Sequence, residues 1–139
     1  MRKLTVLLIV GMAVLGLSVA ASAQSATILR ANIPFAFYAD KVLLPAGQYV
    51  FEMRPIGHGS ATASAVTVRS QDGSWATFLL TMPGTDPNND EQLHFNRYGN
   101  KYFLSKVEAV GLQANVRKNK IEREIRAQIK SQDTTIAAN

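Results

Sequence analysis

Short runs in which apolar and polar residues alternate constrain the fold of this chain more than any other feature. An alternation of period two places every second side chain on one face of an extended strand, and the runs end in Gly, Pro, Asn and Asp, which favour turns. Because such apolar faces must pack against one another, the pattern predicts a mainly β domain: a small antiparallel β-sandwich or barrel of roughly six to seven strands. The alternating apolar residues are Ile33, Phe35 and Phe37; Tyr49, Phe51 and Met53; Val66 and Val68; and Leu93 and Phe95.

Two turns predict strand pairs with a defined register. Asp72-Gly73 is typical of a type I′ hairpin turn. Closing this hairpin places Trp75 on the core face and leaves Phe78 and Leu80 half covered on the other face. Gly99-Asn100 fits a type II′ turn, in which the first central residue has a positive φ. The expected pairs are Val66 with Leu79 and Val68 with Thr77 in the first hairpin, and Phe95 with Leu104, Arg97 with Tyr102, His94 with Ser105 and Leu93 with Lys106 in the second.

The N-terminal segment has the order of a secretory signal peptide. Arg2 and Lys3 precede the uncharged segment Leu4–Ala20, and Ala21-Ser22-Ala23 matches the small-x-small pattern that signal peptidase cleaves. An uncharged segment of this length also fits an uncleaved membrane anchor, but the cleavage pattern favours a leader that is removed. We therefore expect Met1–Ala23 to be removed and the mature protein to be periplasmic or extracellular.

The C-terminal segment changes from period two to a helical repeat. Ile121, Ile125 and Ile129 recur every four residues and predict one amphipathic helix over roughly residues 114–131, followed by a polar tail. The isoleucine stripe either docks on the β domain or lies, with the surrounding cations, on an anionic membrane or a polyanion. The candidate polyanion contacts are Arg117, Lys118, Lys120, Arg123, Arg126 and Lys130.

Positive charge is concentrated in the same segment. Residues 24–116 carry seven basic and seven acidic side chains, whereas residues 117–139 carry six basic and three acidic ones. An electrostatic partner would therefore meet the tail rather than the domain. These features divide the chain into a signal peptide at 1–23, a β domain at 24–111, and a basic amphipathic helix with a polar tail at 112–139.

Few residues could support catalysis or bind a metal. The chain has no cysteine, and its two histidines, His58 and His94, lack the spacing of a zinc site. His94 opposite Ser105 could form a nucleophilic dyad, but no acid is expected on that face to orient the imidazole. The acidic residues at 86–91 lack the pattern of a calcium loop, and no phosphate-binding glycine motif occurs. We therefore expect no catalytic, metal or cofactor site, with a hydrolase that uses His94 as a third alternative.

Aromatic residues offer a different kind of site. An exposed aromatic face would suit a sugar or an apolar ligand, and the alternative is that these side chains fill the core. Arg97 stacked on Tyr102 would add a cation–π contact to the second hairpin. The candidate ligand face consists of Arg97, Tyr98, Tyr102 and Phe103.

Three parts of the chain stand out together: Ile33–Phe37 followed by Leu44–Tyr49, then Leu93–Ser105, then Ile121–Glu124. Their sequences, IPFAF with LPAGQY, LHFNRYGNKYFLS and IERE, resemble in order those of a group of short, secreted proteins of soil bacteria that have no assigned function. The resemblance implies export and a shared small β fold. It implies no activity, substrate or catalytic residue.

The sequence thus predicts an exported, non-catalytic protein that is a binding module or is associated with the cell envelope, with an unidentified ligand. The alternative is a surface-attachment protein that binds an anionic membrane or a polyanion through the basic C-terminal helix. Neither a sequence-specific contact with nucleic acid nor, once the leader is removed, a transmembrane span is expected.

Overall fold

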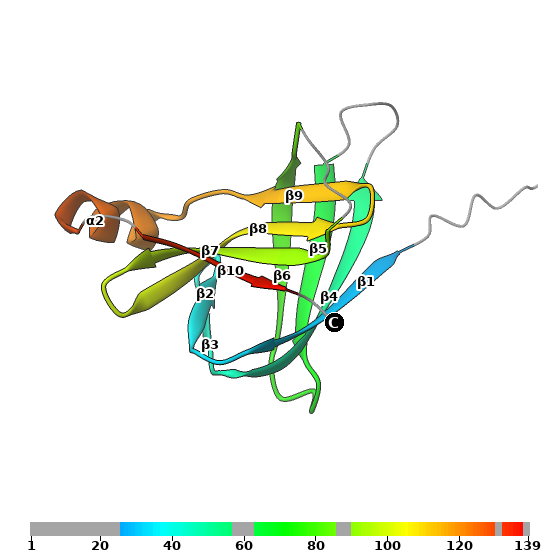
Figure 1. Ribbon diagram of the computed structural model, residues 1–139, viewed down its shortest axis with the longest axis horizontal. Coiled ribbons are helices and arrows are strands. Elements are labelled where there is room, and N and C mark those ends of the chain that lie inside the picture. The colour runs from blue at the N-terminus through cyan, green and yellow to red at the C-terminus, as the bar shows by residue number, and fades with distance from the viewer. Residues whose placement is uncertain (1–25, 57–62, 86–89, 130–131, 138–139) are drawn as a thin grey trace, which may run out of the picture.

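Strands dominate the computed structural model of this chain, and the described part holds one helix, near the C-terminus (Figure 1). The structure describes residues 26–56, 63–85, 90–129 and 132–137. The predicted signal peptide, His58 and Lys130 lie outside the described residues. The strands are β1 (Thr27–Ile33), β2 (Phe37–Ala39), β3 (Val42–Leu44), β4 (Gly47–Ile56), β5 (Ala63–Ser70), β6 (Ala76–Pro83), β7 (Gln92–Tyr98), β8 (Lys101–Ala109), β9 (Leu112–Val116) and β10 (Gln132–Ala137), and the helix is α2 (Lys120–Gln128).

All of these strands belong to one mixed sheet that is not closed. Its order is β1-β4-β5-β6-β9-β8-β2-β3, while β7 pairs with β8 and β10 pairs with β7. β10 comes close to β1 but does not pair with it. The mainly β fold with a C-terminal helix is confirmed. The sheet differs from the expected antiparallel sandwich or barrel because it has more strands, because no ladder closes it, and because β2 runs parallel to β8.

Pro34 explains why the first alternating run is divided between two strands. β1 ends at Ile33 and β2 begins only at Phe37. Proline has no N–H to donate to a ladder, so the chain leaves β4 at this position. β2 then pairs with β3 on one side and with Tyr102 and Phe103 of β8 on the other.

The core lies between the two halves of this bent sheet. In Figure 1, β8 and β9 run across the direction of β4, β5 and β6, and both groups of strands contribute to one buried cluster. Removing each large apolar side chain from water contributes roughly 1.5–3 kcal/mol. The members from the predicted runs are Ile33, Phe37, Tyr49, Phe51, Met53, Val66, Val68, Leu93 and Phe95, with Phe35 packed against them.

The hairpin β5–β6 has the predicted register but a different turn. Both predicted pairs, Val66 with Leu79 and Val68 with Thr77, are present. Gly73 has a φ of 75°, but Asp72 has no positive φ, so the turn is not type I′. Instead, the Gly73 N–H donates to the Ser70 carbonyl at 3.0 Å. The longer connection leaves Trp75 at the end of the sheet with 44% of its surface exposed, so its predicted place in the core is wrong.

The hairpin β7–β8 matches the prediction only near its turn. The pairs Phe95–Leu104 and Arg97–Tyr102 are confirmed, and Gly99 has a φ of 63°. A bulge between His94 and Phe95 then shifts the register, so that His94 lies opposite Lys106 and Leu93 opposite Val107. The predicted pairs of His94 with Ser105 and of Leu93 with Lys106 are therefore wrong, because Ser105 is an extra residue of β8 at the bulge.

The C-terminal segment contains less helix than predicted. Residues 112–116 form β9, which pairs with both β6 and β8, because Gly111 (φ 72°) starts a tight turn out of β8. The helix covers only Lys120–Gln128, and the expected polar tail contains β10, which pairs with β7. A boundary at residue 112 therefore does not separate the sheet from the helix.

Candidate functional site

The four residues of the candidate ligand face lie on two different faces. Tyr102 stacks on Phe35 with ring centroids 3.8 Å apart, and the Arg97 guanidinium lies 5.5 Å from the centre of the Tyr102 ring, so the expected cation–π contact is present. Tyr98 and Phe103 are buried on the opposite face, since neighbouring residues of a strand alternate between faces. The structure therefore does not bring the four side chains together on one exposed surface.

Glu122 anchors α2 to β7. Its Oε1 atom accepts hydrogen bonds from Asn96 Nδ2 at 2.7 Å and from the Tyr98 hydroxyl at 3.2 Å. Asn119 caps the helix because its Oδ1 atom accepts from the Glu122 N–H at 2.8 Å, and its Nδ2 atom donates to the Asp40 carbonyl. The helix is thus docked through polar contacts, and Glu122 is only 3% exposed.

The isoleucine stripe is only partly covered in this docking, since Ile125 alone of its three members is half-buried. Ile121 and Ile129 are both exposed, although Ile129 lies beside Gly99 at the β7–β8 turn. Lys120 makes an exposed ion pair with Glu124 at 3.7 Å, and such pairs contribute at most about 1 kcal/mol. Of the candidate polyanion contacts in the described ranges, Arg117, Lys120, Arg123 and Arg126 are exposed and Lys118 is half-buried.

A polar cluster surrounds Glu108 on the side of β8 that faces away from the core. His94 Nε2 lies 2.7 Å from Glu108 Oε2, while Gln113 Nε2 and Lys106 Nζ lie 2.5 and 3.3 Å from Oε1. Burial acts to raise the pKa of Glu108, but the hydrogen bonds from Gln113, His94 and Lys106 outweigh it and hold that pKa below its usual value. Glu108 is therefore a buried carboxylate that remains ionised.

Glu108 also supplies the acid beside His94 that the sequence analysis does not anticipate. The acid is missed because the bulge, and not the simple hairpin register, brings His94 to the Glu108 side of β8. Ser105 does not complete a triad with this pair, since its hydroxyl donates to the backbone carbonyl of His94 at 3.0 Å. A serine nucleophile must lie within hydrogen-bond reach of its base, and the Ser105 hydroxyl is bonded to a backbone carbonyl instead.

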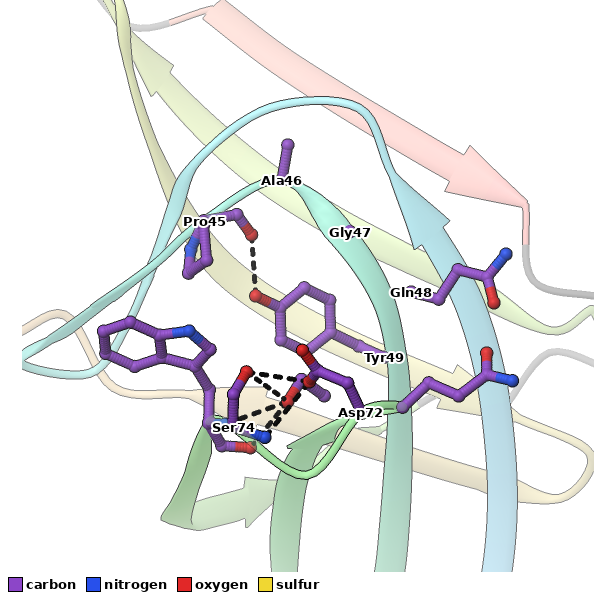
Figure 2. A pocket seen from close by; sticks show the side chains of 10 residues that line it. Pro45, Ala46, Gly47, Gln48, Tyr49, Asp72 and Ser74 are labelled. Atoms are coloured by element: carbon purple, nitrogen blue, oxygen red, sulfur yellow. Dashed lines mark hydrogen bonds between the residues drawn. The ribbon is translucent and has the colours of Figure 1, made fainter.

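A pocket of about 280 Å³ lies between the β3–β4 turn and the β5–β6 hairpin (Figure 2). The Tyr49 hydroxyl donates to the carbonyl of Pro45, in the β3–β4 turn, at 2.7 Å. Asp72 Oδ1 accepts from the N–H and hydroxyl of Ser74 at 3.1 and 2.7 Å, and hydrogen bonds from the Ser70 and Ser74 side chains lower the pKa of Asp72 to about 2. Tyr49, Asp72 and Ser74 thus bond within their own turns, and Trp75 forms an exposed aromatic wall of the pocket.

The edge of β6 is incomplete. β9 pairs with β6 only at Thr81–Pro83, whereas β5 pairs with β6 from Ala76 to Thr81. Among the described strands, none pairs with Ala76–Leu80 on the β9 side. We call Ala76–Leu80 the open edge.

The hydrogen-bond pattern shows which backbone groups of the open edge point away from β5. The Ser70 N–H donates to the Trp75 carbonyl at 2.8 Å, so these residues form a hydrogen-bonded pair. Such pairs alternate along an antiparallel ladder, so Thr77 and Leu79 also bond to β5. The N–H and C=O groups of the intervening residues point the other way. They belong to Ala76, Phe78 and Leu80.

A contact beyond the end of β6 supports the same pattern. The Gly84 N–H, an even number of residues from Phe78, donates to the Gln113 carbonyl of β9 at 3.0 Å. A Cβ at Gly84 would overlap the Gln113 side chain, so a larger residue there would have to displace that side chain. β9 thus satisfies the outward groups at this end of β6, and the open edge has no such partner in the described strands.

Exposed apolar side chains accompany the open edge. Phe78, Leu80 and Met82 are 56%, 70% and 50% exposed, and they line a groove of about 490 Å³ together with Val116 and Arg117. The Arg117 guanidinium lies 3.7 Å from the sulfur of Met82. The sequence signal for this surface is that β6 is apolar on both faces. The sequence predicts that Phe78 and Leu80 are half covered, and both side chains are more exposed than this prediction.

Neither a metal cluster nor a membrane-spanning helix is found in the part of the chain that the structure describes. No three His, Cys, Asp or Glu side chains there gather as a metal site requires. No helix there has the length and apolar character needed to cross a bilayer. Residues 86–89 of the acidic loop lie outside the described ranges.

Comparison with known proteins assigns this chain to no family. No protein-family model, curated protein or solved structure matches it. The function must therefore be inferred from the residues themselves. Among the surfaces described above, the open edge is the one whose outward backbone groups specify a kind of ligand.

Proposed function

We propose that this protein is an exported, non-catalytic binding module that takes up an extended polypeptide as an additional strand on β6. The observation that carries the proposal is the open edge, where the outward backbone groups of Ala76, Phe78 and Leu80 have no neighbouring strand among the described ones, and Phe78 and Leu80 line a groove. An extended peptide satisfies such groups with its own N–H and C=O groups.

The apolar side chains beside the edge support the same ligand class. In strand addition the backbone supplies affinity, and pockets for alternate side chains supply specificity. Phe78, Leu80 and Met82 project on one face at the spacing of alternate residues, which matches the repeat of an added strand. Export is the part of the proposal that the N-terminal sequence supports, through Arg2, Lys3 and the Ala21-Ser22-Ala23 pattern.

Binding of a labelled synthetic peptide of alternating valine and threonine, followed by fluorescence anisotropy, tests this function. The wild-type protein should bind it saturably. Leu80→Lys should weaken binding at least about tenfold, which corresponds to about 1.4 kcal/mol, because a lysine on an edge strand disfavours pairing.

Leu43→Lys is the matched control. Leu43 is an exposed leucine on β3, so its replacement should leave the peptide affinity unchanged. Equal affinities of the Leu80→Lys and Leu43→Lys variants, or no saturable binding by the wild-type protein, would contradict the proposal.

A second function, attachment to an anionic surface, is favoured by one separate observation. α2 is docked through Glu122, so Arg123 and Arg126 remain exposed on the docked helix. Salt-sensitive retention on vesicles of anionic lipid, lost in the double variant Arg123→Gln and Arg126→Gln, would support it. Retention that the double variant leaves unchanged would exclude it.

A further inference from the structure

The face of β1, β4 and β5 that points away from the core carries polar side chains in rows that cross the three strands. Residues directly opposite each other in a ladder project from the same face of the sheet. Arg30 lies opposite Val50, and Val50 lies opposite Arg69. The two arginines thus flank a valine and are two strand spacings apart, roughly 9–10 Å. We call Arg30, Val50 and Arg69 the arginine row.

A row of amides lies beside the arginine row. Asn32 lies opposite Gln48, and each is two residues along its strand from a member of the arginine row, so both project from the same face. Gln71 extends this row, because its backbone N–H donates to the Gln48 carbonyl at 2.9 Å. All three amide side chains are exposed. We call Asn32, Gln48 and Gln71 the amide row.

Two adjoining depressions lie over these rows. One, of about 210 Å³, is lined by the whole amide row together with Arg30 and Val50. The other, of about 620 Å³, is lined by the whole arginine row together with Gln71 and Glu52. Because the two depressions have Arg30, Val50 and Gln71 in common, they form one continuous groove across the three strands.

The groove is cationic, although residues 24–116 carry equal numbers of basic and acidic side chains. Glu52 is the one acid among the described residues that line it, and its Oε1 atom accepts from Arg54 Nε at 2.8 Å while Oε2 lies 3.5 Å from Arg69. In the described part of the chain no carboxylate pairs with Arg30. Three arginines and one glutamate on this face leave a net charge of +2. Asp72, one residue past the amide row, lines the pocket of Figure 2 instead.

We infer that this groove binds an acidic polysaccharide, a chain of sugars that carry carboxylates. A guanidinium bonds to a carboxylate through two parallel N–H donors, and Arg30 and Arg69 offer two such groups. Arg69 has five N–H donors, so its contact with Glu52 leaves most of them available. Side-chain amides both donate and accept hydrogen bonds, which matches the hydroxyl groups of sugars. The groove is a second binding site beyond the proposed function, because it lies on other strands than the open edge and takes another ligand.

Other polyanions fit the groove less well. Proteins that bind duplex DNA through its phosphates typically make about 6–10 such contacts, and this face offers three arginines. Single-stranded nucleic acid is bound largely by stacking on aromatic rings, and the one aromatic residue among the described lining residues, Tyr49, is buried. Anionic membranes typically attract clusters of about 4–8 basic residues. The combination of few cations with neighbouring amides therefore favours a polysaccharide.

Isothermal titration calorimetry of the protein with oligogalacturonate tests the inference. Binding should be saturable and should weaken as salt is added. The fully methyl-esterified oligomer keeps the sugar chain but lacks its charges, so it should bind at least about tenfold more weakly. Arg30→Gln should weaken binding of the acidic form by about tenfold for the same reason. The variant should fold, since Arg30 is exposed, and circular dichroism checks this.

Two further variants separate the groove from net charge. Arg123→Gln is the matched control, because it removes one exposed arginine from α2 and leaves the groove intact, so the affinity should not change. Gln48→Ala should weaken binding by about threefold to tenfold without altering the salt dependence, because it removes a hydrogen-bonding group but no charge. Equal losses in Arg30→Gln and Arg123→Gln, or an unchanged affinity of Gln48→Ala, would overturn the inference.

A duplex DNA fragment and vesicles of anionic lipid are the competing probes. Binding of either as tight as that of oligogalacturonate, with the same loss in Arg30→Gln, would overturn the assignment to a polysaccharide. The absence of saturable binding of oligogalacturonate, or equal affinity for its methyl ester, would overturn the site itself. Arg30→Gln should bind the valine–threonine peptide as the wild-type protein does, since the open edge lies on β6, so failure of one site is distinguishable from failure of the other.

Discussion

Glu108 illustrates how the energetics of a single residue depend on contacts that sequence patterns do not reveal. A carboxylate in the middle of a strand, between Val107 and Ala109, is expected in solvent. Here it is 5% exposed and receives hydrogen bonds or ion pairs from His94, Lys106 and Gln113. These contacts stabilise the ionised form, so protonation of Glu108 should destabilise the fold.

The free energy of unfolding should therefore decrease in acid. The pKa of Glu108 in the folded protein lies below its usual value of 4.5, so its contribution is present above pH 4.5 and is lost as the pH falls through the lower, folded value. Urea unfolding at a series of pH values should show a shallower decrease for Glu108→Gln than for the wild-type protein. At neutral pH, Glu108→Gln should be less stable by about 1–3 kcal/mol. Identical pH dependence in the two proteins would contradict this role.

At the scale of elements, α2 is held by a polar anchor where an apolar stripe is expected. The stripe of isoleucines correctly predicts that a helix forms, but it does not predict how the helix docks. The sequence does contain the missing signal, because Asn119 followed three residues later by Glu122 is typical of a helix N-terminus. That signal places the start of the helix near residue 119, several residues after the position that the isoleucine pattern suggests.

Glu122→Ala should release α2 from β7. The change leaves the buried Tyr98 hydroxyl without this acceptor and should cost about 1–3 kcal/mol in the free energy of urea unfolding. It should also speed proteolysis at the arginines of the helix. Glu124→Ala is the matched control on the same helix, since Glu124 makes only an exposed ion pair and its loss should cost less than about 0.5 kcal/mol. Equal effects of the two variants would show that Glu122 is no anchor.

For the strands, local sequence patterns are sufficient to predict the pairing near the hairpin turns. The register of the β7–β8 hairpin near its turn follows from Gly99-Asn100, since a short turn aligns the flanking residues. The β5–β6 register is also as predicted, because the longer connection is still centred on Asp72-Gly73. The bulge at His94 is not predicted, because it depends on contacts of Ser105 and Glu108 with neighbouring strands. β9 is not predicted because its short alternation from Leu112 to Val116 adjoins the isoleucine repeat, which extends the predicted helix back to about residue 114.

At the scale of the whole molecule, the candidate site arises from the topology. Sequence alternation shows that β6 is apolar on both faces, but not that β9 crosses β6 only at Thr81–Pro83. The pairing of β9 with β8, set by the tight turn at Gly111, fixes that crossing point. The open edge therefore results from the pairing of strands that are distant in the sequence, and no local pattern within β6 predicts it.

Hydrogen exchange of the β6 amides, measured by NMR on a dilute monomeric sample, tests the open edge most directly. We expect the amides of Thr77 and Leu79 to be protected by β5, and those of Phe78 and Leu80 to exchange rapidly. Protection of Phe78 and Leu80 should appear when the valine–threonine peptide is added. Slow exchange of all four amides in the monomer would mean that the edge is already covered, and would contradict the account.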